Sequence, residues 1–348
     1  MRIGYRGHSR PNPLSRRWGV PPSLLPARAT AHANIALAKY WGKSDITRNL
    51  PAVPSISLTL EELVTETEVR FEPGRKHDQL LLDGRRATAA ETRRTTELLD
   101  RVRATAGIEH RATVTSANHF PTAAGLASSA SGFAALAAAA TRASGQELDL
   151  TRLSALARRS SASAARSVFG GFVELAAGAP GEDGLAAKPI APPGHWDLRL
   201  VVAITAAGPK SVGSTEAMER SRTTSPFYEA WVASAPSWCD AVKRAIDDRD
   251  LELLGTAMEQ STLSFHCCAI TSQPSTLYWS PATIAAFQTV THLRASGVPV
   301  WSTMDAGPHV KALCEAVDAT RVADALKQTP GVLRVLFTTP GSGIEVGS

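Results

Sequence analysis

A glycine- and serine-rich stretch at residues 121 to 132, PTAAGLASSASG, has the composition of an anion-binding loop. It runs into an alanine-rich segment that predicts a helix, so unpaired backbone N–H groups and the positive end of the helix dipole would face the loop. Ser128, Ser129 and Ser131 add hydroxyl groups. The stretch therefore predicts a phosphate site. On these residues alone, the alternative is a serine-capped helix that packs tightly in a core.

A second stretch, NIALAKYWGKSD at residues 34 to 45, contains the Gly-Lys-Ser that ends a Walker A phosphate loop. That loop needs an earlier glycine, because backbone N–H groups along its whole length wrap the phosphates. The position that should carry this glycine is Leu37. The apolar residues around it predict a strand, so we reject the Walker A interpretation.

Four separated segments resemble one protein family. The phosphate loop resembles the P-x-x-x-G-L-x-S-S-A motif of the GHMP kinase superfamily. The segments ANIALAKYWGKSD…NLPAVPSISLTL, NHFPTAAGLASSASGFAAL, SSASAARSVFGGFVEL and MDAGPHV are similar to its mevalonate diphosphate decarboxylase branch. The resemblance runs from about Ala31 to Thr338. It implies an α+β GHMP kinase fold, with a ribosomal-S5-domain-2-like N-terminal domain, a ferredoxin-like C-terminal domain and an active site in the cleft between them.

This resemblance implies an ATP-dependent decarboxylation. Members of the branch phosphorylate the tertiary 3-hydroxyl of mevalonate 5-diphosphate, then expel that phosphate together with CO2 to leave isopentenyl diphosphate. Asp305 matches the catalytic aspartate, which can orient or deprotonate the hindered hydroxyl. Arg166 matches the arginine that holds the substrate carboxylate at two points, and Asn34 the asparagine that orients this arginine. Without the resemblance, Asp305 would be interpreted as a turn residue, Arg166 as a solvated helix residue and Asn34 as a polar group at a strand edge.

The resemblance also assigns the remaining ligand contacts. The residues expected at mevalonate diphosphate are Tyr40, Lys43, Ser161, Ser163 and Arg166, and Lys43 is also expected near the reacting centre. The residues expected at ATP are Gly125, Leu126, Ala127, Ser128, Ser129, Ser131 and Ser214. The sequence has no apparent His, Cys and carboxylate cage for a metal. We therefore expect Mg²⁺ to arrive with ATP, bound largely by phosphates and water.

Several positions depart from the family pattern. Ser160-Ser161-Ala162-Ser163 stands where Gly-Ser-Gly-Ser is typical, and Thr215 stands where bacterial members often carry Arg. These changes leave open the length and identity of the phosphorylated tail of the substrate. Mevalonate 5-phosphate or a related 3-hydroxy-3-methyl acid is therefore the alternative substrate. A 3-hydroxyl kinase without decarboxylation is a further alternative. A catalytically silent binding protein on the same scaffold is another, but the retained Asp305 disfavours it.

The first half of the chain is predicted to be rich in strands. Strands are predicted at ARATAHANIALAKYW, SISLTLEELVTETEVRFEP, both sides of the Asp-Gly turn in DQLLLDGRRA, and RATVTSANHFP, around a helix near residues 91–106. The alanine-rich helix after the phosphate loop is predicted to end at Gly145. A helix at about 150–159, a short helix, and a strand beyond Gly170-Gly171 follow.

The second half opens with the predicted strand LRLVVAIT. Helices are predicted at about 214–221, 226–247, 250–265 and 280–295, then strands at VPVWSTMD and VLRVLFTT with a helix between them. The Gly- and Pro-rich segment GAPGEDGLAAKPIAPPGHW predicts a linker. We therefore expect an N-terminal domain at residues 29–190 and a C-terminal domain at 191–348.

Composition restricts the class of protein. The chain has 348 residues, with 37 Lys and Arg against 32 Asp and Glu. Residues 1–28 carry arginines and prolines but no acidic residue, which predicts a mobile basic extension. The extension lacks the interleaving of basic with aromatic residues and the amphipathic period typical of nucleic-acid or membrane binding. No apolar run reaches the ~18 residues of a membrane span, and no signal-peptide core is present.

The four cysteines show neither paired metal-site spacing nor a secreted disulfide framework. A reducing cytoplasm is therefore the expected location. The HCCA sequence at residues 266–269 could suggest a metal site, but packing in a core or interface is favoured. The expected partners are the small-molecule substrate and ATP, with no nucleic acid and no membrane. The family resemblance implies a homodimer.

Overall fold

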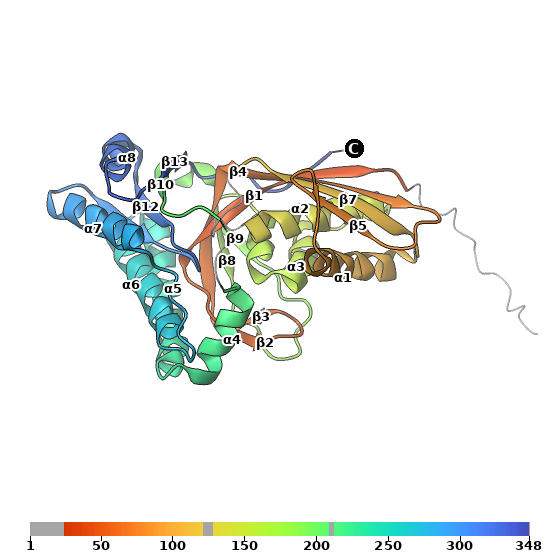
Figure 1. Cartoon of the computed structure of the whole chain (residues 1–348), viewed down its shortest axis with the longest axis horizontal. Helices are drawn as coiled ribbons and strands as arrows, with labels where there is room; N and C mark the ends of the chain where they lie inside the picture. The colour runs from red at the N-terminus through yellow and green to blue at the C-terminus, as the bar shows by residue number, and fades with distance from the viewer. Residues whose placement is uncertain (1–23, 121–127, 209–211, 348) are drawn as a thin grey trace, which may run out of the picture.

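The computed structural model describes residues 24–120, 128–208 and 212–347. These residues form two lobes, and strands β1 (Ala27–Ala38) and β4 (Ser55–Glu72) run from the outer end of one lobe to its boundary with the other (Figure 1). Strands and helices occur in both lobes, as the sequence predicted. None of the described helices is long and apolar enough to cross a bilayer.

Eight of the described strands form the sheet of the N-terminal lobe. Its order is β14-β1-β4-β7-β5-β6, with β8 paired to β4 and β9 paired to β8. Neighbouring strands are antiparallel except β5 and β7, which are parallel. The strands other than β1 and β4 are β5 (Gln79–Leu82), β6 (Arg85–Arg86), β7 (Arg111–Asn118), β8 (Phe172–Leu175), β9 (Lys188–Ala191) and β14 (Glu345–Gly347).

Helices α1 (Ala89–Ala106), α2 (Ser128–Ala143) and α3 (Leu150–Ser160) lie along one side of this sheet (Figure 1). Thr88 and Glu91 form a capping box that satisfies the first backbone N–H groups of α1. The α2 helix packs on β1 and β4 through buried alanines, whose small side chains permit a close approach. Gly145 follows α2 with a φ of 74°, the left-handed conformation expected of a residue that ends a helix.

The sheet of the C-terminal lobe has the order β11-β12-β10-β13. Its strands are β10 (Leu198–Ile204), β11 (Val300–Thr303), β12 (Val310–Glu315) and β13 (Arg334–Thr338). Side chains alternate between the two faces of a strand. In β10, Val201 and Ala203 pack in a core with α7 (Pro281–Ala295) and α8 (Ala319–Lys327), whereas Leu200 and Val202 pack in a core with α5 (Tyr228–Asp248) and α6 (Leu251–Ile270).

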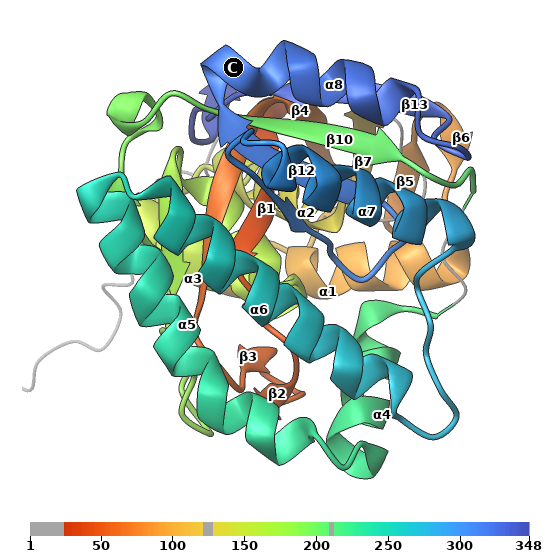
Figure 2. The ribbon, with the colours of Figure 1, turned by 90° about the vertical axis from the view of Figure 1, so that its left-hand side faces the viewer.

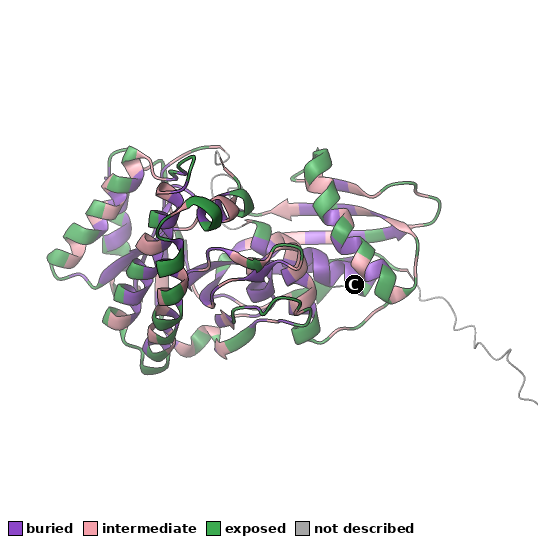
Figure 3. Ribbon diagram, turned by 90° about the horizontal axis from the view of Figure 1, so that it is seen from below, coloured by how far each residue is buried: buried purple, intermediate pink, exposed green. Residues whose placement is uncertain are grey.

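The second of these cores joins the two lobes. It contains Ile35 of β1 and Leu58 of β4 together with Leu200 of β10 and Met258 of α6. Figure 2 shows α5 and α6 in front of β1, and Figure 3 shows the buried residues concentrated inside both lobes. Shared packing of this kind fixes the end of β1 against α6, close to the candidate site.

Short elements complete the boundary between the lobes. They are the strands β2 (Lys43–Asp45) and β3 (Leu50–Pro51), the helix α4 (Ser214–Thr224), and the 3-10 turns η1 (Ala162–Val168), η2 (Pro193–His195) and η3 (Ala316–Asp318). Trp41 ties the turn between β1 and β2 to this region. Its Nε1 donates to Ser221 Oγ over 2.9 Å, and its carbonyl accepts from Trp231 Nε1 over 2.8 Å.

The structure differs from the sequence prediction in several places. The predicted linker contains β9 and η2, because its residues 188–191 pair with β8. The strand β12 was not predicted, since a lysine and a cysteine interrupt its apolar pattern. Arg28, assigned to the mobile extension, lies in β1 and forms ion pairs with Glu66 and Glu68. Residues 1–23 lie outside the described residues.

The end of the chain returns to the N-terminal lobe. Strand β14 pairs antiparallel with β1, so that Arg28 lies opposite Gly347 and Thr30 opposite Glu345. The Gly341 N–H also donates to the Thr59 carbonyl, and the Gly341 carbonyl accepts from the Gly171 N–H. The expected C-terminal domain at 191–348 therefore does not form one separate lobe, because its last residues complete the N-terminal sheet. The boundary at residue 190 stays a prediction.

Candidate active site

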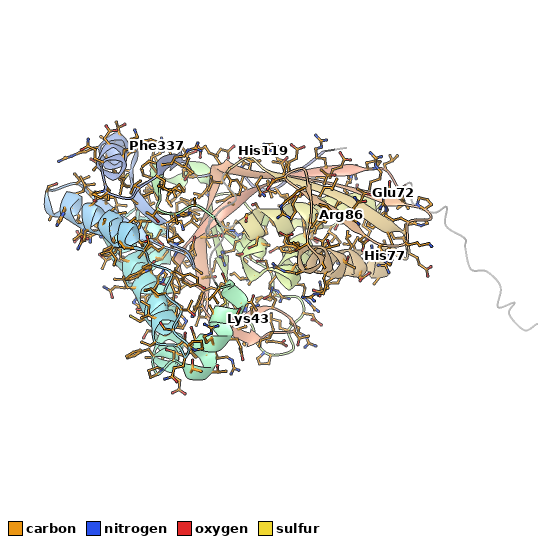
Figure 4. All side chains as sticks on the ribbon, viewed as in Figure 1. Lys43, Glu72, His77, Arg86, His119 and Phe337 are labelled. Atoms are coloured by element: carbon orange, nitrogen blue, oxygen red, sulfur yellow. The ribbon has the colours of Figure 1, made fainter. Side chains whose placement is uncertain are left out.

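A cavity of about 1320 Å³ lies between the two lobes. Its walls come from the end of β1, the β2–β3 hairpin, the first turns of α1 and α2, η1, α4, α6 and the loop after β11. Figure 4 places the lining residue Lys43 beside this hairpin and α4, far from Glu72, His77 and Arg86 at the other end of the N-terminal lobe. The residues predicted to handle the acid substrate all line the cavity: Asn34, Tyr40, Lys43, Ser161, Ser163, Arg166 and Asp305.

Asp305 lies in the loop between β11 and β12, and a lysine holds each of its carboxylate oxygens. Lys39 Nζ donates to Oδ1 over 2.8 Å, and Lys311 Nζ donates to Oδ2 over 3.0 Å. The two lysine side chains are 3% and 0% exposed, respectively, whereas that of Asp305 is 23% exposed. Asp305 and Lys39 line the cavity, whereas Lys311 does not, and Asp305 is the most exposed of the three.

Burial and charge act in opposite directions on this cluster. Burial alone would raise the pKa of Asp305, but the charges of Lys311 and Lys39 and their hydrogen bonds hold that pKa well below its usual range. Burial lowers the pKa of Lys39 to about 8, although the Asp305 carboxylate opposes this shift. At neutral pH, Asp305 is thus an anion and Lys39 is mostly a cation.

Arg166 lies in η1 and is 2% exposed. Its Nη1 donates to Ser55 Oγ over 2.8 Å, and its Nη2 donates to Asn34 Oδ1 over 3.4 Å. Asn34 is fixed in turn, because its Nδ2 donates to the Ser163 carbonyl and to Ser167 Oγ over 3.0 and 2.8 Å. The structure therefore brings together the arginine and the asparagine that the sequence paired.

Within the described part of the chain, no carboxylate forms an ion pair with Arg166, and its buried Nε has no hydrogen-bond partner. Burial lowers the pKa of Arg166 to about 10, so the guanidinium stays charged at neutral pH. A buried cation with an unused donor, on the wall of a cavity, is suited to an anionic ligand. A carboxylate fits the planar guanidinium best.

A second group of cations lies at the hairpin side of the cavity. Lys43 Nζ donates to Thr215 Oγ1 over 3.3 Å. Burial, and then the charge of Arg94, lower the pKa of Lys43 to about 8. Arg94 of α1 lies 4.5 Å from the centre of the Phe133 ring and donates to the Ser160 carbonyl over 3.1 Å. With the hydroxyls of Ser161 and Ser163 nearby, these groups can bind a phosphate or diphosphate.

The predicted nucleotide residues divide into three sets. Ser128 and Ser129, at the first turn of α2, and Ser214, at the first turn of α4, line the cavity. Ser131 does not line it, because its buried hydroxyl bonds Thr65 Oγ1 over 2.7 Å between α2 and β4. Gly125, Leu126 and Ala127 lie outside the described residues. The N-termini of α2 and α4 therefore face the same cavity with serine hydroxyls.

The donors present suit a magnesium ion that is carried by a nucleotide. The described residues contain no group of three His, Cys, Asp or Glu side chains that could hold a metal by themselves. The cavity-lining carboxylates Asp305, Glu216 and Glu219 are already paired with lysine or arginine. A magnesium ion here would depend on phosphate oxygens and water.

In the HCCA sequence, Cys268 is buried and Cys267 is exposed on α6.

Sequence reasoning missed Lys39, Lys311 and Arg94. Lys39 follows the apolar residues of β1, and Lys311 interrupts those of β12. A lysine is unusual in such a run, and this position in the sequence could have identified both residues. Arg94 belongs to an Arg-Arg pair in the first turns of α1, where a solvated helix face was the simpler interpretation.

Comparison with known proteins agrees with this geometry. Residues 31–186 match the diphosphomevalonate decarboxylase-like N-terminal domain family, and residues 200–334 match the mevalonate 5-diphosphate decarboxylase C-terminal domain family. The diphosphomevalonate decarboxylase of Candida albicans is 33% identical over 353 residues, which cover 92% of this chain and 97% of the relative. The chain belongs to the diphosphomevalonate decarboxylase family.

Two further similarities bear on this member of the decarboxylase family. The phosphomevalonate decarboxylase of Haloferax volcanii is 34% identical over 305 residues, covering 87% of this chain and 92% of the relative. The solved structure of MDDEF in complex with MVAPP, AMPPCP and magnesium is 38% identical, with a TM-score of 0.87, and covers 93% of this chain and 99% of that one. The predicted GHMP kinase fold with N- and C-terminal domains is confirmed.

Proposed function

We propose that this protein decarboxylates mevalonate 5-diphosphate with ATP, and yields isopentenyl diphosphate, ADP, phosphate and CO2. The observation that carries the proposal is Arg166, a buried cation whose hydrogen bonds orient it but which forms no ion pair with a carboxylate of the described residues. A decarboxylase needs such a partner for the acid that it cleaves. A kinase acting on the hydroxyl alone has no comparable need.

The first step is transfer of the ATP γ-phosphoryl group to the 3-hydroxyl. The hydroxyl oxygen forms a bond to phosphorus, the bond between phosphorus and the bridging oxygen breaks, and ADP leaves. Asp305 accepts a hydrogen bond from the hydroxyl and so aligns its oxygen. Since the pKa of Asp305 is low, the hydroxyl proton transfers to the Asp305 carboxylate late, when the oxygen already carries the phosphoryl group and is much more acidic.

The second step removes that phosphate together with CO2. The bond between C3 and the phosphate oxygen breaks, and positive character develops at C3. The electron pair of the bond between C1 and C2 then forms the double bond between C2 and C3, and C1 leaves as CO2. Arg166 holds the carboxylate in place. The positive charge of Lys39, which lies beside Asp305 where the phosphoryl group is transferred, stabilises the negative phosphate as it leaves.

The substrate tail is proposed to occupy the cavity next to the hairpin. Lys43, Arg94, Ser161 and Ser163 line that part of the cavity and supply charged and hydroxyl donors. ATP is proposed to lie with its phosphates at the first turns of α2 and α4, near Ser128, Ser129 and Ser214. Mg²⁺ carried by ATP neutralises phosphate charge when it is bound.

Mevalonate 5-phosphate is the second candidate substrate. The Haloferax relative is a phosphomevalonate decarboxylase with an identity similar to that of the fungal diphosphomevalonate decarboxylase. In addition, position 215 carries Thr, which offers one hydroxyl and no charge to a second phosphate. Besides Lys39, Lys43 and Arg166, three arginines line the cavity, namely Arg93, Arg94 and Arg220. Their number favours the diphosphate.

Product analysis with purified protein distinguishes these functions. The protein is incubated with ATP, Mg²⁺ and either mevalonate 5-diphosphate or mevalonate 5-phosphate, each labelled with carbon-14 at C1. We expect equal amounts of ADP and labelled CO2, with the larger kcat/KM for the diphosphate. A larger kcat/KM for the monophosphate would select the second candidate. Formation of ADP without CO2 would show that the protein is a kinase. Formation of neither ADP nor CO2 would show that it is a catalytically silent binding protein.

We also propose a homodimer that acts in the cytoplasm. The dimer rests on the family resemblance alone, and sedimentation equilibrium of the full chain measures it. The location is supported by the four cysteines, all of which are free thiols in the structure, as expected in a reducing compartment. Fractionation of cells, with antibody detection of the protein, tests that location.

A further inference from the structure

Lys311 is an ion-pair partner of Asp305 that no motif or comparison assigned. It lies in β12, where it pairs in register with Val202 of β10 and Thr303 of β11. Its side chain is 0% exposed, and it does not line the cavity. Lys311 therefore approaches the carboxylate from inside the protein, on the side away from the space that a substrate would fill.

The surroundings of Lys311 are apolar. Its neighbours along the strand, Val310 and Ala312, point to the opposite face of β12 and pack in the core under α7 and α8. Leu313, on the same face of β12 as Lys311, packs in the core that joins the lobes. An ammonium group in such a place is unfavourable without a charged partner. The Asp305 carboxylate, whose Oδ2 lies 3.0 Å from Lys311 Nζ, is the partner that balances the charge of this ammonium group.

The geometry leaves each oxygen of Asp305 with one lysine. Lys311 occupies Oδ2 from behind, and Lys39, which lines the cavity, occupies Oδ1. Lys39 is itself fixed, since its backbone N–H donates to Ser261 Oγ of α6 over 2.9 Å. With two anchors, the carboxylate plane cannot rotate about its bond to the side chain without breaking a buried ion pair.

Other charged or titratable groups face this cluster. Arg166 of η1 interacts electrostatically with both Asp305 and Lys39. His266 of α6 lies near Asp305, Lys39 and Lys311, and burial lowers its pKa to about 3, so it is neutral at neutral pH. The cluster thus contains three cations, Lys39, Lys311 and Arg166, and one anion, Asp305. The excess positive charge suits a reaction in which a phosphoryl group passes at this point.

We infer that Lys311 is a positioning residue for phosphoryl transfer: it fixes Oδ2 of Asp305 from inside the protein, so that Oδ1 and Lys39 meet the substrate hydroxyl in one orientation. The inference rests on the proposed function. It adds an internal cation that touches neither substrate nor nucleotide and acts only through Asp305.

Steady-state kinetics of K311M and K311R, from about pH 5 to pH 9, test the inference. K311M keeps an unbranched side chain but loses the charge. We expect its kcat to fall about 100-fold, the scale of misplacing a catalytic group by about 1 Å, with the KM for ATP little changed. Without Lys311, the pKa of Asp305 should rise, so the acid limb of kcat, which lies below pH 5 in the wild type, should move up towards this range in K311M. K311R should recover part of the lost rate.

K327M is the matched control, because Lys327 pairs with Asp324 over 3.1 Å at an exposed position on α8. Its kcat and pH profile should equal those of the wild type. A K311M enzyme with wild-type kcat and an unmoved acid limb would overturn the inference. A wild-type enzyme that releases no CO2 would instead overturn the proposed function, so the two failures are distinguishable.

The double variant D305N/K311M addresses the case in which K311M does not fold. It removes the ammonium of Lys311 together with the carboxylate, and it leaves Lys39 without its carboxylate, as D305N alone does. If Lys311 acts only through Asp305, kcat of D305N/K311M should equal that of D305N within about twofold. A large further loss in the double variant would show that Lys311 acts independently of Asp305, and would overturn the inference.

Discussion

Asp305 combines properties that are rarely found in one carboxylate. It reaches a cavity, yet both of its oxygens are bonded to nearly or fully buried lysines. The lysines lower its pKa, which makes it a weak base but a well-fixed acceptor of a hydrogen bond. Such a group aligns a hindered hydroxyl more effectively than it deprotonates one.

Replacing Asp305 by Asn should lower kcat by about 10³-fold or more while ATP binding stays nearly unchanged. The amide keeps the shape of the side chain, but it cannot carry the charge that the two lysines face. Quenched-flow measurement of ADP formation, with ATP affinity from calorimetry, checks both parts. Turnover similar to that of the wild type would remove Asp305 from the mechanism.

Arg166 is expected to act on the substrate carboxylate. R166M should lower the rate of CO2 release by about 100-fold or more. R166K should restore only part of it, because an ammonium cannot hold a carboxylate at two points. Release of labelled CO2 measures the effect. R142M is the control, since Arg142 forms an exposed ion pair with Glu147, and equal losses in both variants would contradict the assignment.

Lys43 is expected to bind the phosphorylated tail. K43A should raise the KM for the mevalonate ester about tenfold or more, the scale of one charge-assisted hydrogen bond, while the KM for ATP stays close to that of the wild type. K76A, at an exposed position after β4, serves as the control. The opposite pattern, with ATP affinity lost and the ester unaffected, would restore the Walker A interpretation of Gly42-Lys43-Ser44.

The sequence predicted part of this site for reasons that can be stated residue by residue. Asn34, Arg166 and Asp305 lie in motifs that resemble those of the family, and the structure brings them to one cavity. Lys39 lies inside one of those motifs but was not selected, because nothing local shows that its partner is Asp305, 266 positions later. The pairing depends on the packing of β1 against α6, which no short pattern encodes.

At the scale of elements, strong periodicity gave reliable predictions and mixed composition did not. The alternating residues of β4 and the alanines of α2 predicted their structures well. In β12, Lys311 and Cys314 obscure the apolar pattern, and the strand is recognised only because both β10 and β11 pair with it. In β9, Pro189 favoured a linker, although β9 lies at the edge of its sheet, where proline is tolerated.

The turn between β1 and β2 depends on Gly42. Its φ is +104°, and a Cβ at this position would lie 1.9 Å from Tyr228 Oη of α5. G42A should therefore lower the free energy of unfolding by about 1–3 kcal/mol more than a substitution that only strains the backbone. It should also raise the KM for the mevalonate ester, because Tyr40 and Lys43 flank the turn.

G74A is the matched control for this prediction. Gly74 has a φ of +80°, and a Cβ there would meet nothing within 4 Å. Urea unfolding of both variants separates backbone strain from the collision with Tyr228. If the two variants lose equal amounts of stability, the contact between the turn and α5 is not what requires glycine at position 42.

At the scale of the whole molecule, the buried His266 should make folding sensitive to acid. Burial lowers its pKa from 6.5 to about 3. Between these values the unfolded chain binds a proton that the folded protein does not, so the free energy of unfolding should fall as the pH falls. H266Q should show a shallower decrease than the wild type between about pH 6.5 and pH 4.

Chemical denaturation at a series of pH values measures this slope. H77Q is the control, since His77 is exposed at the far end of the N-terminal lobe, where Figure 4 labels it. Its slope should equal that of the wild type. An H266Q protein with the wild-type slope would show that other groups, and not His266, set the acid sensitivity of the fold.

The pairing of β14 with β1 also constrains when the protein can finish folding during synthesis. Ribosomes release a chain from its N-terminus, so the strand that carries Asn34 emerges long before its outer neighbour β14. Until residues 345–347 leave the exit tunnel, one side of β1 keeps unpaired N–H and C=O groups that can pair with other chains. A ribosome that stalls before residues 345–347 are synthesised would therefore hold a chain with an open sheet edge, a species that chaperones are expected to bind.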